Sequence, residues 1–192
     1  DMWSNYGRIL SEYVFIKDFR NSKLSNNISI EGQEILEKIK QDSKPVIFIS
    51  GHFNNFELMA MEIEKAGIDL CTIYRPLNNL FLNIVMEKLR KDYICKNQIK
   101  KGKSGTRILL KLFKENFSVA LMIDQRVSEG ESVNLFSHLA KTTTIPAQLT
   151  KKYDCKIIPV YIERFEKIYF RLSFKKPIKF DNNSSIKQIT LE

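Results

Sequence analysis

The sequence predicts a single α/β domain with a mostly parallel central sheet flanked by helices. Short apolar runs alternate with amphipathic segments along the chain, and the length of 192 residues suits one domain. Near the end, an alternating segment at Ile168–Phe174 follows an apolar run at Lys156–Ile162. We therefore also expect an antiparallel hairpin at the C-terminal edge of the sheet.

The first half of the chain supplies two of the predicted strands. Residues 2–19 place apolar side chains at helical spacing and predict an amphipathic helix. Ser29 is expected to cap the next helix. Val46–Ser50 is a continuously apolar run, which is typical of a buried parallel strand. A helix over Asn55–Lys65 and a strand over Leu70–Tyr74 are expected to follow.

The second half continues the alternation. A helix is expected from about Leu80 to Lys91, and another around Ile108–Phe113. Val119–Ile123 predicts a strand, followed by a loop. Pro146 is expected to open a helix, because proline favours the first helical turn.

Polar residues follow three of the predicted strands. In parallel sheets, sites collect at the carboxyl ends of strands, so we expect these residues to share one site. The three clusters are Gly51-His52, Arg75-Pro76 and Asp124-Gln125.

The net charge of +9 favours acidic partners, namely nucleic acid, anionic lipid or an acidic carrier protein. A lysine-rich solvated surface explains the charge equally well. No apolar run approaches the roughly 18 residues of a membrane-spanning helix, and no signal peptide is visible. Because the chain starts at Asp1 and ends in a helix-like stretch, we expect it to be a fragment of a longer protein.

Three cysteines form no C-x-x-C pair, and their odd number argues against a disulfide framework. A reduced, cytoplasmic setting fits this pattern. The two histidines lie far from the cysteines in sequence, so no metal site is expected, and no cofactor is predicted.

The string GHFNNFE at residues 51–57 contains the strongest candidates for catalytic residues. If His52 lies on the turn before a helix and Glu57 in its first turn, the two side chains can meet. A carboxylate bonded to one imidazole nitrogen leaves the other free to take a proton from a substrate hydroxyl. The alternative is that His52 caps a helix and Glu57 is an ordinary first-turn acid.

This string, placed after a buried strand, resembles the H-x4-D/E box of the glycerolipid acyltransferases. It is most similar to the late acyltransferases of lipid A biosynthesis, the lauroyl/myristoyl acyltransferase family, whose string reads G-H-x-G-N-W-E. Asn54 stands where Gly is usual and Phe56 where Trp is usual.

Further boxes of the family follow in order along the chain. The family has counterparts of three of them: MWSNYGR at residues 2–8, the Y-R-P box at residues 74–76 and a Gly- and Arg-containing box at residues 101–107. So do the D-Q pair at residues 124–125 and a stretch at residues 135–142, in which Ser137 replaces a usual Gly.

The resemblance implies transfer of an acyl chain from an acyl carrier protein thioester to a hydroxyl of a lipid A precursor. The expected setting is the cytoplasmic face of the inner membrane of a Gram-negative bacterium. Residues 1–192 would then form the catalytic domain of a protein that also has an N-terminal membrane anchor and a further C-terminal segment.

The expected catalytic residues are His52 as general base and Glu57, which orients and charges it, with no acyl-enzyme intermediate. The expected substrate-binding residues are Arg75, Arg107, Asp124, Gln125 and Asn55. Arg75 is expected to hold a phosphate or carboxylate.

Two of these residues keep alternative roles. Arg107 is expected either to bind a lipid phosphate or to pair with Glu57. Asp124 is either a wall of the site or a structural hydrogen-bonding residue.

Two other functions remain open at this point. One is an acyl-CoA-dependent acyltransferase that acts on a glycerophospholipid or another glycolipid. The other is a basic nucleic-acid-binding module, which only the charge suggests and for which no binding motif is present. For the favoured lipid A acyltransferase function, the expected partners are an acyl carrier protein, an anionic glycolipid and the membrane surface, with no nucleic acid.

Overall fold

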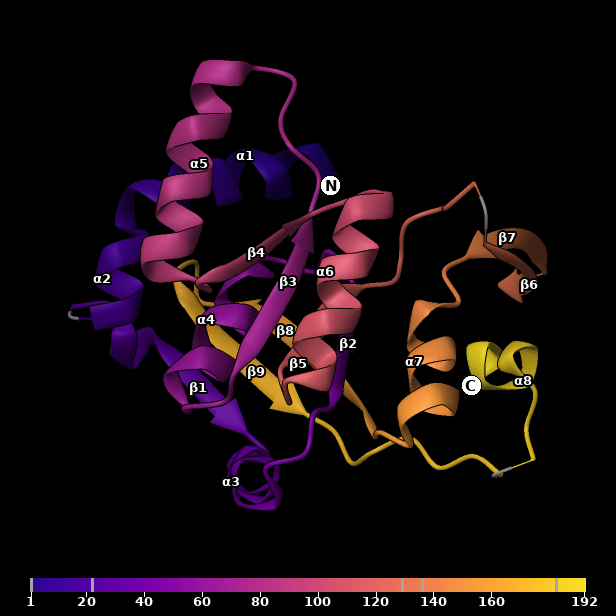
Figure 1. The fold of residues 1–192 in the computed structure, drawn as a ribbon. Helices are drawn as coiled ribbons and strands as arrows, with labels where there is room; N and C mark the ends of the chain where they lie inside the picture. Colours follow the sequence, from indigo (N-terminus) through magenta and orange to yellow (C-terminus); the bar gives the residue numbers. More distant parts are fainter. Residues whose placement is uncertain (1, 22, 129, 136, 182) are drawn as a thin grey trace.

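A seven-stranded sheet lies at the centre of the computed structural model, with strand order β1-β9-β8-β2-β5-β3-β4 (Figure 1). The structure describes residues 2–21, 23–128, 130–135, 137–181 and 183–192. The central strands are β1 (Ile28–Glu31), β2 (Ile47–Ser50), β3 (Leu70–Tyr74), β4 (Asn97–Lys100), β5 (Ser118–Met122), β8 (Ile157–Phe165) and β9 (Tyr169–Phe174). A separate antiparallel hairpin consists of β6 (Glu131–Leu135) and β7 (His138–Thr142).

Helices cover both faces of this sheet. They are α1 (Met2–Glu12), α2 (Ile16–Asn21), α3 (Gln33–Asp42), α4 (Glu57–Lys65), α5 (Leu80–Tyr93), α6 (Lys103–Lys114), α7 (Ile145–Tyr153) and α8 (Ile186–Leu191), with short 3₁₀ turns η1 (Tyr13–Phe15) and η2 (Ser25–Asn27). Within the described part of the chain, no helix is long and apolar enough to span a bilayer.

The predicted fold class is confirmed. Strands β8, β2, β5, β3 and β4 run parallel, and β9 returns antiparallel to β8 as the expected hairpin. The hairpin is not outermost, however, because β1 pairs parallel with the free side of β9.

The role predicted for Ser29 as a helix cap is wrong. Ser29 lies inside β1, where its hydroxyl donates a hydrogen bond to the carbonyl of Phe170 at 3.2 Å. Ile28 and Ile30 alternate with polar residues and pack against the core, so this segment completes the sheet. Gly32, with φ of 82°, then starts α3.

Two other strand regions were not predicted. In β4, the polar segment Asn97–Lys100 buries only Ile99, so it lacks the apolar alternation of a typical strand. The β6–β7 hairpin lies where a loop was expected. Ser137 has φ of 67° there, in the left-handed region that favours glycine, which explains why the resembling pattern has Gly at this position. Phe136 of the same stretch lies outside the described residues.

The sheet separates two layers of apolar side chains. Phe48 of β2 packs on the face covered by α1 to α5, whereas its neighbours Ile47 and Ile49 pack with α6 to α8. This alternation along β2 explains the continuously apolar run in the sequence, because both faces of the strand are buried.

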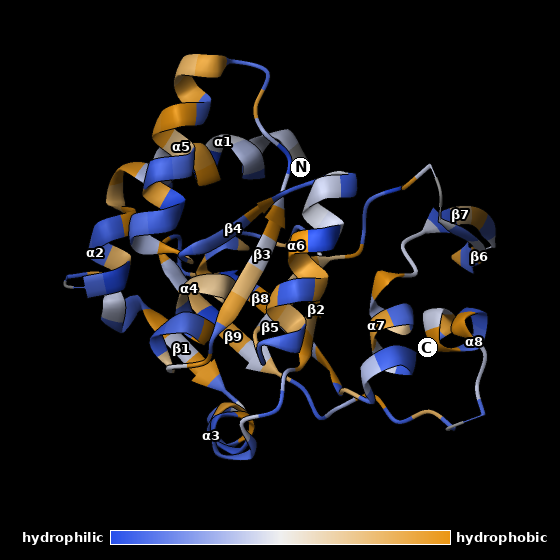
Figure 2. Ribbon diagram, viewed as in Figure 1, coloured by the Kyte–Doolittle hydropathy of each residue, from blue (hydrophilic) through white to orange (hydrophobic). Residues whose placement is uncertain are grey.

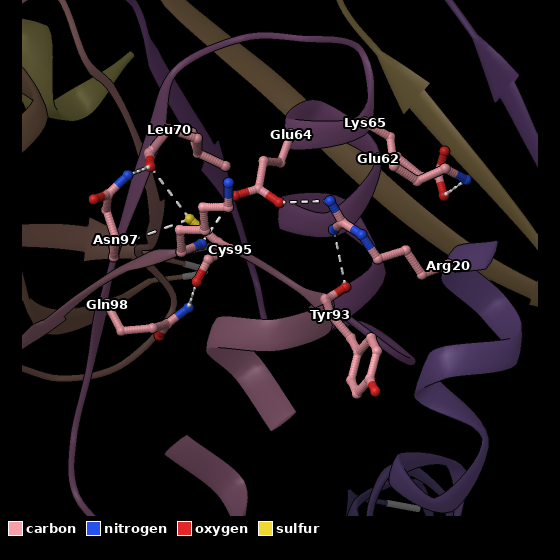
Figure 3. Close-up of polar contacts among 10 residues, drawn as sticks. Arg20, Glu62, Glu64, Lys65, Leu70, Tyr93, Cys95, Asn97 and Gln98 are labelled. Carbon is pink, nitrogen blue, oxygen red and sulfur yellow. Dashed lines mark hydrogen bonds and ion pairs between the residues drawn. The ribbon is translucent and has the colours of Figure 1, made fainter. Parts of the chain in front are cut away.

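A polar network joins α2 to α4 and to the end of α5 (Figure 3). Arg20 of α2 donates hydrogen bonds to the Glu64 carboxylate at 2.8 Å and to the Tyr93 carbonyl at 3.1 Å. The second oxygen of Glu64 accepts from the backbone N–H of Lys96 at 2.9 Å. The thiol of Cys95 donates to the carbonyl of Leu70 at 3.2 Å. These contacts fix α2, α4 and the end of α5 relative to one another.

The three cysteines are free and buried. Burial raises the pKa of Cys71 and Cys95 to about 12 and that of Cys155 to about 11. At neutral pH the thiolate form is therefore scarce, so these side chains act as packing groups and not as nucleophiles.

Replacement of Gly105 and of Gly7 by alanine should change the free energy of unfolding in opposite directions. A Cβ at Gly105, in α6, would lie 1.9 Å from the carbonyl oxygen of Lys100, whereas one at Gly7, in α1, would meet no atom within 4 Å. We expect Gly105→Ala to lower the free energy of unfolding by about 1–3 kcal/mol through overpacking. Gly7→Ala, the matched control, should raise it by about 0.5–1 kcal/mol. Urea unfolding of both variants measures this, and equal midpoints would contradict the close approach of α6 to β4.

Candidate active site

The turn after β2 brings His52 to the carboxyl edge of the sheet. Gly51 is buried at this turn, and a Cβ there would lie 2.8 Å from the Phe53 ring and 3.1 Å from Oδ2 of Asp124. A glycine at this position therefore leaves room for the Asp124 carboxylate beside the turn. Asn54 follows with φ of 44°, so a residue that tolerates the left-handed region occupies a position where the resembling pattern has Gly.

The carboxylate of Asp124 holds His52 at two points. Its Oδ1 lies 2.7 Å from Nδ1 of the imidazole, and its Oδ2 accepts the backbone N–H of His52 at 2.7 Å. Asp124 lies two residues after the end of β5, which pairs with β2, and the N–H of Ile123 between them extends this pairing to the carbonyl of Ser50. The two ends of neighbouring parallel strands thus place the acid against the imidazole.

This geometry leaves Nε2 as the nitrogen of His52 that contacts no carboxylate of the described residues. A carboxylate at Nδ1 favours the tautomer that carries its proton on Nδ1, so Nε2 remains an acceptor. The side-chain nitrogen of Gln125 lies 3.5 Å from Nε2, and the Phe56 ring packs edge-on against the imidazole at 4.7 Å between centroids. His52 is therefore oriented on three sides.

The predicted bond between Glu57 and His52 is corrected by these contacts. Among the described residues, the carboxylate that bonds His52 is Asp124, while Oε1 of Glu57 accepts from Nε and Nη2 of Arg90 at 3.0 and 2.5 Å. The same oxygen accepts the hydroxyl of Tyr13. Glu57 is the first residue of α4, and its buried side chain joins η1, α4 and α5.

Burial and mutual attraction fix the charges of this cluster. Burial raises the pKa of Tyr13, and the Glu57 carboxylate raises it further, so the phenol stays protonated as a donor. Burial acts to lower the pKa of Arg90, but Glu57 and Tyr13 outweigh it and hold that pKa above its ordinary range. Arg90 therefore stays positive and is neutralised by Glu57.

A cleft of about 690 Å³ opens beside His52 at the carboxyl ends of the strands. His52, Gln125 and Glu57 contribute to its wall, and so does Tyr6 of α1. Four cationic side chains besides Arg90 line it: Arg75, Lys100, Lys101 and Arg126. A hydroxyl substrate with negative groups can therefore lie with the hydroxyl near Nε2 and its charges among the cations.

Arg75 lies where the sequence predicted, at the end of β3 in the cleft wall, with its side chain exposed. Arg107 does not share this position: it is exposed on α6 and is not among the described residues that line the cleft. Its alternative role as the partner of Glu57 is wrong, because Arg90 fills that role.

Asn55 lies behind the site and not in the cleft wall. It is buried, and its amide donates to the Glu12 carboxylate at 2.8 Å. Glu12 in turn forms an ion pair with Arg164 of β8. Asn55 therefore joins α1 to the start of α4. It does not contact the cleft, so any effect on the substrate is indirect, through the conformation of the turn that carries His52.

A second pocket, of about 310 Å³, lies on the other side of the His52 turn. Gly51 and Asp124 contribute to its wall, and apolar side chains form most of the rest: Ile49, Phe53, Ile123, Pro159, Val160 and Tyr161. The His52–Asp124 pair thus lies between a cationic cleft and an apolar pocket.

Arg90 and Tyr13 are site residues that the sequence did not reveal. A signal was present for Arg90, which lies four residues after the buried Met86 and so falls on the inward face of α5. A cation on such a face needs a buried anion. The sequence gives no comparable signal for Tyr13, which looks there like an ordinary core aromatic. Only the structure shows that its hydroxyl donates to Glu57.

The Glu57–Arg90 pair predicts a loss of stability when its charge balance is broken. Glu57→Gln leaves a cation largely buried without its partner, so we expect the free energy of unfolding to fall by about 3 kcal/mol or more. The double variant Glu57→Gln/Arg90→Met should recover part of this loss. Asp42→Asn is the control, because its ion pair with Lys156 is exposed and should contribute less than about 1 kcal/mol. Urea unfolding compares them; a Glu57→Gln loss no larger than that of Asp42→Asn would contradict an anchoring role.

A comparison with known families matched the chain. The family model described as bacterial lipid A biosynthesis acyltransferase matches residues 1–192, the whole chain. No curated protein gives a significant match to the sequence. The match confirms the resemblance drawn from the ordered boxes, and it makes the protein an acyl-transferring enzyme. The chain belongs to the bacterial lipid A biosynthesis acyltransferase family.

Proposed function

We propose that the chain moves a fatty acyl group from an acyl carrier protein thioester to a hydroxyl of a lipid A precursor, with His52 as general base. The observation that carries this proposal is the His52–Asp124 pair, whose free Nε2 adjoins a cleft lined by cations. A lipid A precursor is an anionic glycolipid, which suits these cations. We place the reaction at the cytoplasmic face of the inner membrane of a Gram-negative bacterium.

The chemistry then requires one base and no covalent enzyme intermediate. Nε2 of His52 takes the proton of the acceptor hydroxyl as its oxygen attacks the thioester carbonyl. The tetrahedral oxyanion collapses, the carbon–sulfur bond breaks, and the imidazolium returns the proton to the leaving thiolate. The products are an ester and a free thiol. Asp124 stabilises the imidazolium between these two transfers.

Direct attack is supported by the residues of the cleft. Among those the structure describes, no cysteine or serine lines the cleft. The apolar pocket beyond Asp124 offers a place for the acyl chain, because apolar walls exclude water from the hydrocarbon. Donor and acceptor would then approach His52 from opposite sides.

The overall activity is tested by mass spectrometry of lipid A. A host that lacks its own late acyltransferase would be complemented with the full-length gene, and its lipid A should gain one acyl chain. Purified protein given acyl carrier protein and CoA thioesters separately would identify the donor. An unchanged lipid A mass would contradict the acceptor, and faster turnover of the CoA thioester would favour the acyl-CoA alternative.

Substitutions in the pair should abolish turnover without unfolding the protein. We expect His52→Ala to lower the rate by about 10²–10⁴, which is typical of a lost general base. Asp124→Asn should cause a loss of the same order, because its amide N–H₂ can face Nδ1 and favour the wrong tautomer. Steady-state kinetics and circular dichroism measure this; near-normal turnover by folded His52→Ala would exclude it as the base.

Substitution of Arg75 should change the affinity for one substrate. Arg75→Ala should raise the apparent KM for one substrate more than it lowers kcat, because an exposed arginine in the cleft wall binds a phosphate or carboxylate. Arg75→Lys should recover activity only partly, since lysine lacks the planar fork. Arg107→Ala is the matched control, because Arg107 is exposed outside the cleft. Kinetics against donor and acceptor separately decide it; equal KM changes in the two alanine variants would contradict the assignment.

A further inference from the structure

The first two turns of α5 carry an exposed apolar surface. Phe81, Leu80 and Ile84 are 86%, 75% and 68% exposed, and Leu82 and Val85 are exposed beside them. We call these five residues the α5 tip. Figure 2 shows this end of α5 as hydrophobic where it stands out from the rest of the fold. Leaving such side chains in water is unfavourable, and a cluster of them marks an interaction surface.

The tip carries no outward hydrogen-bonding side chain over residues 80–85, all of which the structure describes. The polar residue among them, Asn83, turns inward, where its Oδ1 accepts the N–H of Leu77 at 2.8 Å and its amide donates to Glu87 at 2.7 Å. Asn79 caps the helix by accepting the N–H of Leu82 at 3.0 Å. The helix is therefore held from within, while its outer surface offers hydrocarbon alone. Protein interfaces usually include about one hydrogen bond per 100–200 Å², which this surface cannot supply from its side chains.

Positive charges lie behind the tip on the same face of α5. Successive residues turn by about 100°, so Leu80, Phe81, Ile84 and Val85 span an arc of about 140°. Lys88 and Lys91 fall within this arc and are exposed. Asp92 shares the face beside Lys91 at the end of the helix away from the tip, so Lys88 is the nearer positive charge and the face keeps a net positive charge. An apolar end followed by lysines matches a bilayer, where hydrocarbon lies beneath anionic headgroups.

The tip closely follows residues of the cleft wall along the chain. Leu77 and Asn78, which closely precede α5, line the cleft together with Arg75 and Lys101. A lipid surface that contacts the tip would therefore present headgroups to the cationic cleft wall. We propose that the α5 tip inserts into the hydrocarbon of an anionic membrane surface and holds the cleft mouth against it. This proposal rests on the proposed function, because an enzyme whose acceptor is a lipid must meet that surface.

Vesicle binding tests the tip without any substrate. The triple variant Leu80→Gln/Phe81→Gln/Ile84→Gln keeps good helix formers on α5 while removing the apolar surface. We expect its partition onto phosphatidylethanolamine–phosphatidylglycerol vesicles to fall at least about tenfold. The matched control, Leu135→Gln/Leu139→Gln/Ile168→Gln, removes three exposed apolar residues elsewhere and should bind like the unmodified chain. Equal binding by both triple variants would overturn the proposal.

Depth and charge can be measured separately. In a Trp3→Phe background, the fluorescence of the Phe81→Trp variant should be quenched by brominated phospholipids, and that of the Leu139→Trp variant should not. Lys88→Gln/Lys91→Gln should weaken binding several-fold on anionic vesicles and leave binding to phosphatidylethanolamine–phosphatidylcholine vesicles unchanged. An unquenched Phe81→Trp variant would overturn the proposal. So would a triple variant that loses self-association or carrier-protein binding while its vesicle binding stays unchanged. Vesicle binding without acyl transfer would instead refute the proposed function and leave the tip assignment in place.

Discussion

The two hydrogen bonds from Asp124 to His52 are the constraint on which the site depends. They exist only because β2 and β5 are neighbours in register, so that both carboxyl ends finish at the same level. The imidazole is then fixed by backbone and side chain together, before any substrate arrives. Such preorganisation reduces the reorganisation that a general base must undergo in the transition state.

A second layer of charge supports this arrangement from behind. Glu57 begins α4 immediately after the His52 turn, and its bonds to Arg90 and Tyr13 join α4 to α5 and to the N-terminal segment. The H-x4-E spacing thus serves two different purposes. Its histidine faces the cleft, where we propose that it acts as the base, and its glutamate fixes the helix that follows the turn.

The fold class and the place of the site were predictable because they follow from local patterns. Apolar runs such as Val46–Ser50 reveal buried strands, and residues after such strands meet at one edge. The partner of His52 was not predictable in the same way. Glu57 lies nearby in sequence, whereas Asp124 approaches only through the pairing of β2 with β5, which no local pattern encodes. For the same reason Arg90, distant in sequence, was missed as the partner of Glu57.

The central claim is that Asp124 fixes the imidazole of His52 with its proton on Nδ1 and Nε2 free. Long-range ¹H–¹⁵N NMR of the two histidines, at a pH where the imidazoles are neutral, reads the tautomer directly. We predict the Nδ1–H form of His52 in the unmodified chain and in Glu57→Gln, and its loss in Asp124→Asn. An Nε2–H form in the unmodified chain, or a tautomer that responds to Glu57→Gln but not to Asp124→Asn, would contradict the account.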